Sequence, residues 1–239
     1  MIDISIAIPT FESYGKGSEF LDDLLRTIEI QKGNLTYEVC ISDHSKDDSI
    51  LIKVDEFKDR LPIKYYRNKN AYGNGPANTN NAIEMCSGDI IKVMFQDDFF
   101  YDDEALQKIY NALNDSDKMW LLNGCNHTAD HGHSFYWDFY PEFNDKLLDG
   151  VNTISSPSVV AFKKEVTRRF DPSLTFYMDI DFYYGMRVDY GDPVLYNDIL
   201  ISNRFPSDYS VTTNVSNKNK EYYERTESEY CKKKYGVIQ

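Results

Sequence analysis

Cysteine is scarce in this sequence of 239 residues, and the cysteines that it has lie far apart. Cys40, Cys86, Cys125 and Cys231 form no C-x-x-C pair, which argues against a structural zinc site and against a disulfide framework. Residues 1–10 lack the basic start of a signal peptide, and no apolar stretch approaches the roughly 20 residues of a membrane span. We therefore expect a cytoplasmic protein with reduced thiols and no membrane span.

Positive charge is also in short supply. Lysine and arginine number 26 against 39 aspartates and glutamates, which gives a formal net charge of −13 at pH 7. Because binding to duplex nucleic acid needs clustered Lys and Arg to neutralise phosphates, no nucleic acid partner is expected. An anionic ligand would have to bring its own cation. The lysine run at 232–234 leaves a peripheral contact with a membrane open without establishing it.

No Gly-x-Gly-x-x-Gly follows the first strand pattern, so a dinucleotide site of the usual kind is not expected. The chain has instead a regular alternation of strand and helix patterns separated by short loops. The patterns predict strands at 2–9, 37–42, 63–67, 90–95 and 119–125, and helices at 20–28, 50–58, 77–86, 103–113, 178–187 and 220–235. This alternation predicts an α/β fold with a mostly parallel, doubly wound central sheet flanked by helices.

The apolar stretch at 90–95 breaks abruptly into Gln96, Asp97 and Asp98. A short apolar run of this kind is typical of a buried central strand, whose carboxyl end lies at the sheet edge where ligands bind. Paired acids there are poorly explained by packing, because buried charge without a partner is costly. Bound Mg²⁺ or Mn²⁺ would remove that cost and would bridge to phosphate oxygens. The alternative is a plain surface turn in an acidic chain.

Polar residues follow the other strands as well. Asp43 comes directly after the second strand and either caps the following helix or faces a ligand. Glu12 follows the first strand and is either a solvated loop acid or part of the same pocket. Asn78, Asn80 and Asn81 cluster at a helix start although asparagine is a mediocre helix former, so they are either caps or amides held for a polar ligand.

Four features in a fixed order carry a resemblance to a known family. They are the strand ending Pro9-Thr10-Phe11-Glu12, the strand ending Ile41-Ser42-Asp43-His44-Ser45, the helix start Asn78-Thr79-Asn80, and Gly88-Asp89 followed by Gln96-Asp97-Asp98. Together they resemble the family 2 inverting glycosyltransferases with a GT-A nucleotide-sugar fold, and the resemblance extends to about Arg204. Gln96 stands where that family commonly has the first acid of a triplet.

The resemblance implies a role for each of these positions. Asp98 is implied as the main ligand of a Mn²⁺ or Mg²⁺ ion, and Asp97 as a second ligand or a contact to ribose or sugar. Asp43 resembles the acid that accepts the N3–H of the base, which fits a pyrimidine nucleotide such as UDP. The nucleotide-sugar site is further implied to include Pro9, Thr10, Glu12, Asn78, Asn80, Gln96, Asp97 and, as a phosphate contact in the loop 199–210, Arg204.

A second pair of acids, at the start of the helix at 178–187, resembles the family's Glu-Asp motif with its trailing arginine. By its spacing to Arg187, Asp181 matches the catalytic aspartate, while Ile180 replaces the preceding glutamate and Asp179 supplies a nearby charge. An inverting transfer needs one ionised carboxylate to take the proton of the acceptor hydroxyl. Asp181 is the expected base, with Asp179 beside it, and the alternative is a pair of acids that merely favour the helix start.

Two further segments are expected on the acceptor side. Residues 150–162 resemble the family segment that crosses the active site before a strand. His127, His131 and His133 lie close enough in sequence to suggest a transition metal, but Asp130 and Gly132 favour a polar, acceptor-facing loop.

These expectations describe one domain. A glycosyltransferase domain spans 1–212, with a nucleotide-sugar-binding half at 1–100 and an acceptor-binding half at 101–212, and 213–239 form a C-terminal helical tail that could contact a second subunit in a homodimer. The expected activity is metal-dependent, inverting transfer of a sugar from a nucleotide-diphospho-sugar to a glycan or lipid-linked glycan, in polysaccharide or glycan synthesis. The rivals are a nucleotidyltransferase and a catalytically inactive sugar- or nucleotide-binding domain.

Overall fold

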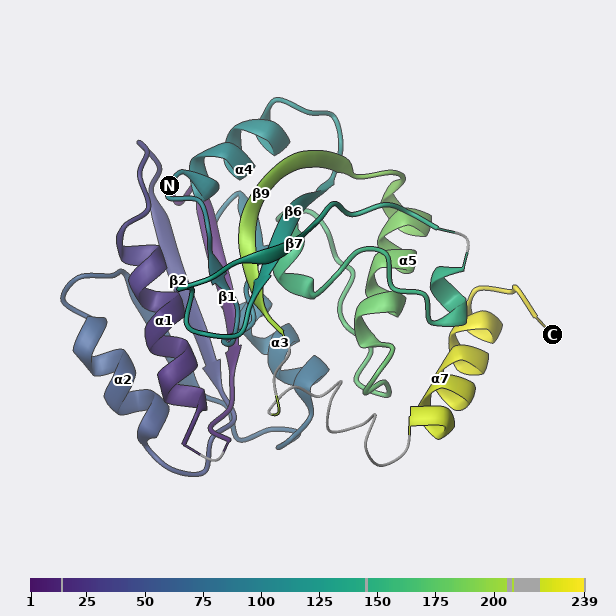
Figure 1. Ribbon diagram of the computed structural model, residues 1–239, viewed down its shortest axis with the longest axis horizontal. Coiled ribbons are helices and arrows are strands. Elements are labelled where there is room, and N and C mark those ends of the chain that lie inside the picture. Colours follow the sequence, from purple (N-terminus) through teal and green to yellow (C-terminus); the bar gives the residue numbers. More distant parts are fainter. Residues whose placement is uncertain (14, 145, 206–207, 209–219, 239) are drawn as a thin grey trace.

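The computed structural model describes the chain except for residues 14, 145, 206–207, 209–219 and 239 (Figure 1). Its centre is a curled sheet flanked by helices. Among the described residues the sheet has nine strands, in the order β3-β2-β1-β4-β8-β6-β9-β5, with β7 paired to β6. The α/β fold expected from the alternating pattern is confirmed.

The first half of the chain builds the parallel part of the sheet. In chain order its elements are β1 (Ile4–Thr10), α1 (Gly17–Glu29), β2 (Tyr37–Asp43), α2 (Ser49–Phe57), β3 (Ile63–Arg67), α3 (Gly75–Glu84) and β4 (Ile90–Val93). β1 lies between β2 and β4 and runs parallel to both, and β3 runs parallel to β2 on its other side. The carboxyl ends of these strands therefore share one edge of the sheet.

Burial explains the sequence patterns of these elements. β1 and β2 are buried along almost their whole length, as expected for central parallel strands covered on both faces. β3, at the end of the sheet, alternates between half-buried and exposed residues. One face of α1 packs on the core, because its buried apolar residues fall at helical spacing: Phe20, Leu21, Leu24, Leu25 and Ile28.

The second half of the chain adds antiparallel strands, so the complete sheet is a mixed one. Its elements are β5 (Phe99–Phe100), α4 (Ala105–Asn114), β6 (Trp120–Thr128), β7 (Tyr136–Phe139), the 3-10 helices η1 (Leu147–Asp149) and η2 (Pro157–Val159), β8 (Val160–Lys163), α5 (Met178–Tyr190), β9 (Val194–Arg204) and α7 (Lys220–Lys234). β8 lies antiparallel between β4 and β6, and β9 runs parallel to β6 with β5 antiparallel on its other side. The parallel arrangement expected from the alternation thus holds throughout the first half, whereas in the second half only the β6–β9 pair is parallel among the described strands.

The C-terminal helix α7 packs against the rest of the protein. It lies beside α5, at the end of the molecule far from α2 (Figure 1). Cys231 is completely buried, and the Ser228 hydroxyl donates to the carbonyl of Leu148 at 2.7 Å. The expected boundary between residues 212 and 213 lies outside the described residues, so that division stays a prediction. None of the described helices is both long and apolar enough to cross a lipid bilayer.

Candidate active site

The candidate site lies where the carboxyl ends of several strands meet, toward the lower centre of Figure 1. Thr10, the last residue of β1, is paired with Asp43, the last residue of β2. Asp98 follows β4 and accepts a hydrogen bond of 3.1 Å from the backbone N–H of Arg204, the last residue of β9. The topology thus brings acids from distant parts of the chain to the edge where α/β sheets bind ligands.

Asp97 and Asp98 form a pair of adjacent acids, of which Asp98 is buried and Asp97 is half-buried. The Asp98 carboxylate accepts from the Ser156 hydroxyl at 2.8 Å as well as from the Arg204 backbone. Burial, together with the neighbouring Asp98, raises the pKa of Asp97 to about 7, and burial also raises the pKa of Asp98. The Arg204 guanidinium pairs with Asp23 at 2.7 Å, and within the described residues no Lys or Arg forms an ion pair with Asp97 or Asp98.

Lys92 is a buried basic residue close to these acids. In the sequence it lies inside the apolar stretch at 90–95 and did not stand out as a candidate site residue. Its side chain is completely buried on β4, and its Nζ donates to Asn123 at 2.9 Å and to the carbonyl of Ser158. Burial lowers the pKa of Lys92 well below its usual value, although the charge of Asp98 opposes this. Its Nζ contacts are with Asn123 and Ser158, and among the described residues Lys92 forms no ion pair with Asp97 or Asp98.

Gln96 has a defined partner in the loop after β1. Its amide Nε2 donates to the carbonyl of Phe11, and its Oε1 accepts from the N–H of Phe11, both at 2.8 Å. An aspartate cannot make this pair because an ionised carboxylate has no donor. Gln96 therefore ties the acidic turn to the loop after β1, and it supplies no third carboxylate for a metal.

Asp43 is a second buried acid at this edge, and its charge is compensated. One oxygen lies 2.9 Å from Nε of Arg67 and accepts from the Tyr65 hydroxyl at 2.7 Å, and the other accepts from the N–H of Ser45 at 2.8 Å. Burial, with the adjacent Asp43, raises the pKa of Tyr65 to about 12, so the phenol remains a donor. Its contacts hold the Asp43 carboxylate in one orientation.

Asn78 holds the ends of β1 and β2 together. Its Nδ2 donates to the carbonyls of Thr10 and Ser42 at 3.1 and 2.9 Å, and its Oδ1 accepts from Ser42 and Asn68 at 2.7 and 3.2 Å. These four bonds use the full capacity of the amide. The Thr10 hydroxyl also donates to the Ser42 carbonyl at 3.3 Å, and Pro9 lies opposite Ser42 in the strand pair. Asn78 and Thr10 thus shape the sheet edge.

Glu12 and Asn80 are engaged by the backbone. The Glu12 carboxylate accepts from the N–H groups of Gly17 and Ser18 at 3.0 and 2.9 Å and so caps the start of α1. Asn80 makes a two-way pair with the N–H and carbonyl of Phe170, both at 2.8 Å. Asn80 also lines a cavity of about 260 Å³, whose other lining residues are Asn68, Asn70, Ala71, Ala77, Asn81, Glu84 and Pro172. Asp43 and Asp98 are not among these lining residues.

A bridge of hydrogen bonds leads from Asp98 to α5. It begins where the Ser156 hydroxyl donates to Asp98 at 2.8 Å and ends where the Asn152 amide donates to Asp179 at 2.8 Å. Between these ends, the Ser156 hydroxyl lies 3.1 Å from Oδ1 of Asn203, and Nδ2 of Asn203 donates to the Ser155 hydroxyl at 2.6 Å. The Asn152 amide donates to the Ser155 carbonyl at 3.2 Å. Three of the four residues between the two acids belong to the segment 150–162 that was expected to cross the site.

The two acids of α5 face opposite ways. Residues two positions apart on an α-helix are rotated by about 200°, so Asp179 and Asp181 cannot share a face. Burial raises the pKa of Asp179 to about 6. Asp181 is completely buried on the other side, where it accepts from Nζ of Lys234 and from the Tyr235 hydroxyl, both at 2.9 Å.

These contacts do not bring Asp181 toward Asp98, where the expectation that it is the base had placed it. Its carboxylate lies against α7, with a cation and a phenol as partners, whereas Asp179 is the acid joined to Asp98. The spacing to Arg187 favoured Asp181 but does not report which side of the helix faces the site. Arg187 itself pairs with Asp192 at 2.8 Å.

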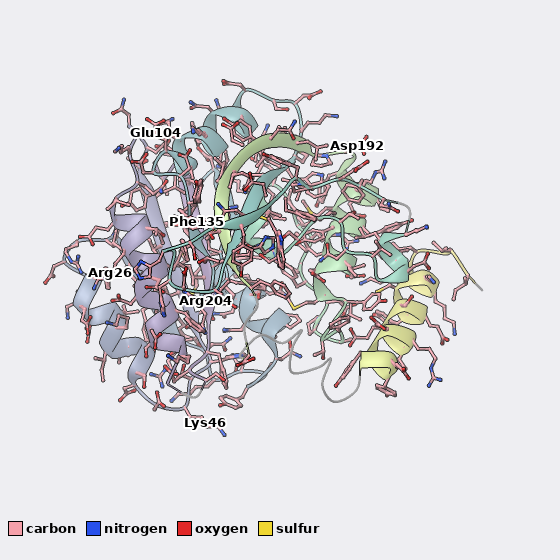
Figure 2. The ribbon with its side chains drawn as sticks, in the orientation of Figure 1. Arg26, Lys46, Glu104, Phe135, Asp192 and Arg204 are labelled. Carbon is pink, nitrogen blue, oxygen red and sulfur yellow. The ribbon has the colours of Figure 1, made fainter. Side chains whose placement is uncertain are left out.

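Arg204 ties the end of β9 to α1 and to the acidic turn (Figure 2). Its guanidinium lies 4.4 Å from the ring centre of Phe20, pairs with Asp23, and donates to the carbonyl of Asp97 at 3.2 Å. A contact from Arg204 to phosphate stays a prediction. The expected loop 199–210 begins as part of β9, and residues 206–207 and 209–210 lie outside the described residues.

The histidines at 127–133 have separate partners. His131 lies 3.1 Å from Glu19 and 2.6 Å from Asp23, whereas Nδ1 of His127 contacts the carbonyl of Trp137 at 2.9 Å. In the part of the chain that the structure describes, no three His, Cys, Asp or Glu side chains are arranged to hold a metal ion. The structure therefore offers no support for a transition metal at these histidines.

An exposed aromatic cluster beside the site gave no signal in the sequence. It consists of His127, Tyr136, Trp137 and Phe205, with ring centres 4.9 to 6.4 Å apart. Trp137 is 66% exposed and has a φ of 51°, which non-glycine residues rarely adopt. Phe205 directly follows Arg204, which donates to the carbonyl of Asp97, so the cluster adjoins the acidic turn. Exposed rings on a strained backbone are features of ligand-binding surfaces.

Parallel strands with acids at their carboxyl ends, an acid pair after β4, and a further acid on a helix at the same edge define a class: the GT-A nucleotide-sugar transferases. The model of "Glycosyl transferase family 2" matches residues 5–171. The chain belongs to glycosyl transferase family 2. The matched region ends before α5, so the placement of Asp179 rests on the structure.

Solved structures share this fold. Over 89% of this chain and 61% of the other, S. aureus TarS 1–349 in complex with UDP-GlcNAc is 16% identical, with a TM-score of 0.71. The mannosyltransferase PcManGT from Pyrobaculum calidifontis, in complex with GDP-Man and Mn²⁺, is 13% identical with a TM-score of 0.68, over 95% of this chain and 64% of the other. At these identities the likeness shows the fold alone.

A curated relative matches a shorter segment. Chondroitin synthase from Pasteurella multocida (strain Pm70) is 38% identical over 72 residues, which are 30% of this chain and 7% of the synthase. The chain thus spans only a small part of that protein and less than two thirds of the two structures above.

Proposed function

We propose that this chain catalyses the metal-dependent, inverting transfer of a sugar from a nucleotide-diphospho-sugar to a hydroxyl group of a glycan. The observation that carries the proposal is the hydrogen-bonded bridge that joins Asp98 to Asp179 at the carboxyl edge of the sheet. Asp98 lies beside the carboxylate of Asp97, and Asp179 lies at the start of α5. Carboxylates in different surroundings can take different roles in one site.

Asp98 and Asp97 are the residues that would hold the metal. Two adjacent carboxylates with raised pKa values, one buried and one half-buried, fit a hard divalent cation, because bound positive charge favours their ionised forms. Mg²⁺ and Mn²⁺ are commonly held by one or two carboxylates together with substrate phosphates and water. When bound, the cation would offset the negative charge that develops on the departing diphosphate. The Mn²⁺ in the PcManGT complex supports this choice.

Asp179 is the proposed base. The acceptor oxygen bonds to the anomeric carbon while the bond from that carbon to the diphosphate oxygen breaks and its electron pair leaves with the diphosphate. Asp179 takes the proton of the acceptor hydroxyl. A pKa of about 6 leaves the carboxylate ionised at neutral pH while keeping it more basic than an ordinary aspartate. The Asn152 amide, which donates to one carboxylate oxygen, orients it.

The donor is proposed to carry a pyrimidine base that Asp43 recognises. The rings of Phe11 and His44 lie 6.0 and 6.1 Å from the ring of Tyr72, near this end of the sheet, and could stack on a base. TarS was solved with UDP and with UDP-GlcNAc, which supports uridine, whereas PcManGT was solved with GDP-Man. The fold therefore admits either base, and the donor must be found by experiment.

The acceptor is proposed to be a glycan that lies against the aromatic cluster. Sugar rings pack well on exposed aromatic faces, and the cluster adjoins the acidic turn. The similarity to chondroitin synthase supports a polymer or other glycan as the product. A cytoplasmic location and a homodimer stay predictions.

Turnover of nucleotide sugars tests this proposal. The protein is incubated with Mn²⁺ and a panel of UDP-, GDP- and CDP-sugars, and release of free sugar and nucleoside diphosphate is measured without an acceptor. We expect slow, Mn²⁺-dependent hydrolysis of one UDP-sugar. A nucleotidyltransferase would instead release pyrophosphate from a nucleoside triphosphate and a sugar phosphate. A catalytically inactive domain would bind a nucleotide without releasing sugar.

A further inference from the structure

The C-terminal helix α7 contacts the entry of α5 through one acid. Glu227 is only 7% exposed, and its carboxylate accepts three consecutive backbone N–H groups, those of Thr175, Phe176 and Tyr177, at 2.9, 2.8 and 2.8 Å. The first helical residue of α5 is Met178, and its N-cap residue, Tyr177, makes no side-chain cap. Glu227 thus holds, from another helix, the three residues that lead into α5, and one of the three N–H groups is that of the N-cap residue Tyr177.

This contact bears directly on Asp179, the second residue of α5. The position of a side chain in the first turn follows the path of the backbone that enters the helix. Bonds from a carboxylate to N–H groups are charge-assisted and hold geometry more tightly than neutral bonds. The three bonds to Glu227 therefore fix the segment that delivers Asp179 to Asn152.

A second anchor holds the other face of α5. Lys234, the last residue of α7, and Tyr235, which follows it, bond to Asp181, and Tyr230 and Lys234 bond to Asp171 at 2.8 Å. These contacts explain why Asp181 is buried away from the site. They also separate two tasks of α7, because the anchor at Asp181 supports packing while the contact at Glu227 reaches the entry to the catalytic turn.

We propose that Glu227 is a positioning residue for catalysis, which sets the place of Asp179 from the C-terminal helix. The proposal rests on the role of Asp179 proposed above. It makes α7 part of the active site's framework, although nothing in the sequence of that helix indicates this role.

The charge of Glu227 provides a readout that packing alone would not give. Burial raises the pKa of Asp179 most, hydrogen bonds from the backbone N–H groups of Ile180 and of Asp179 itself lower it, and the Glu227 charge adds a smaller rise. The other titratable group facing Asp179 is Tyr183, on α5, whose phenol is also faced by Cys125 of β6 and by Asp98 after β4. Because these groups stay in place, removing the Glu227 charge should lower the pKa of Asp179.

The test compares Glu227→Gln, Glu227→Asp, Asp179→Asn and a matched control, Glu229→Gln, which removes the same charge from an exposed position of α7. Turnover of the nucleotide sugar that the donor panel selects is measured with Mn²⁺ from pH 5 to 9, alongside thermal melting. For Glu227→Gln we expect kcat to fall about 10- to 100-fold with KM for the donor unchanged. The acid limb of the kcat profile should move to lower pH.

Glu227→Asp keeps the charge but shortens the side chain. We therefore expect kcat to fall while the acid limb of its pH profile stays in place. This variant provides the test if Glu227→Gln does not fold.

The outcomes separate the two proposals. If Asp179→Asn retains full turnover, the role of Asp179 as base fails. If Asp179→Asn is inactive while folded Glu227→Gln matches Glu229→Gln in kcat and in its acid limb, the role of Glu227 is refuted and the base assignment stands. A rise in KM with kcat unchanged would likewise overturn the positioning role.

Discussion

The acids at the carboxyl edge of the sheet and at the start of α5 fall into two groups that differ in how their charge is met. Asp43 and Asp181 each have a cation and a phenol as partners: Arg67 and Tyr65 for Asp43, and Lys234 and Tyr235 for Asp181. Asp97, Asp98 and Asp179 form no ion pair with Lys or Arg among the described residues, and burial raises the pKa of each.

This difference indicates which acids stabilise the fold and which acids are available to bind a ligand or take part in catalysis. An acid whose partners are supplied by the protein stabilises the fold as it stands, whereas a buried acid without a cation costs free energy until something binds or a proton is transferred. We call these the compensated acids (Asp43 and Asp181) and the uncompensated acids (Asp97, Asp98 and Asp179). If this division is correct, substituting an uncompensated acid should reduce catalysis, whereas substituting a compensated acid should reduce stability.

The largest effect is expected from Asp179→Asn. An amide cannot take a proton from the acceptor, so kcat should fall about 10²- to 10⁴-fold. Donor binding should be nearly unchanged because Asp43 and Asp98 are intact. Single-turnover transfer and calorimetric binding of UDP measure the two quantities. Weakened UDP binding with normal turnover would show that Asp179 serves the donor instead.

Asp98→Asn should give the next largest effect, a fall in turnover of about 10²- to 10³-fold. The reason is loss of the carboxylate that would hold Mn²⁺ against the diphosphate. We therefore also expect Mn²⁺ to stop strengthening UDP binding, which titration calorimetry with and without the ion detects. Glu104→Gln, which removes an exposed acid from the same acidic stretch, is the control and should leave Mn²⁺-dependent binding unchanged.

Much of this arrangement could be predicted from sequence. Strand patterns that end in Asp43 and in Asp97-Asp98 suffice to bring these acids to one edge, because parallel strands align their carboxyl ends. Asp179 and Asp181 could not be separated in this way. Both lie in the first turn of one helix, and the side that Asp181 faces is covered by α7, a helix distant in sequence.

The amide side chains could not be assigned from sequence for a related reason. Gln96, Asn78 and Asn80 bond to backbone groups of Phe11, Thr10 and Phe170, and local sequence does not report such long-range partners. The environment of Lys92 could not be predicted for the same reason. Its amine bonds to Asn123 and to the carbonyl of Ser158, which are distant in sequence from the apolar strand that contains it.

Asp181→Asn should have a smaller effect, on stability rather than on chemistry. The change leaves Lys234 and Tyr235 without their carboxylate, and because Asp171 still pairs with Lys234, we expect a loss of about 1–3 kcal/mol in the free energy of unfolding. Below its melting temperature the variant should retain kcat within a few-fold. Urea unfolding and transfer rates measure these quantities. Asp192→Asn, which breaks an exposed pair with Arg187, should change stability by less than about 1 kcal/mol.

The smallest expected effect has the opposite sign and concerns the stability of Asp179→Asn. In the folded chain Asp179 has a pKa of about 6, above its ordinary 3.8, so the folded state holds this proton more tightly than the unfolded state does. The stability contributed by this group is present below pH 3.8 and is lost as the pH rises through about 6. Asparagine avoids that loss, so the variant should melt a few degrees above the parent at pH 8 without metal or nucleotide. The difference should shrink at pH 5.5. Asp181→Asn should melt below the parent at pH 8, and if Asp179→Asn does so too, the distinction between compensated and uncompensated acids does not hold for α5.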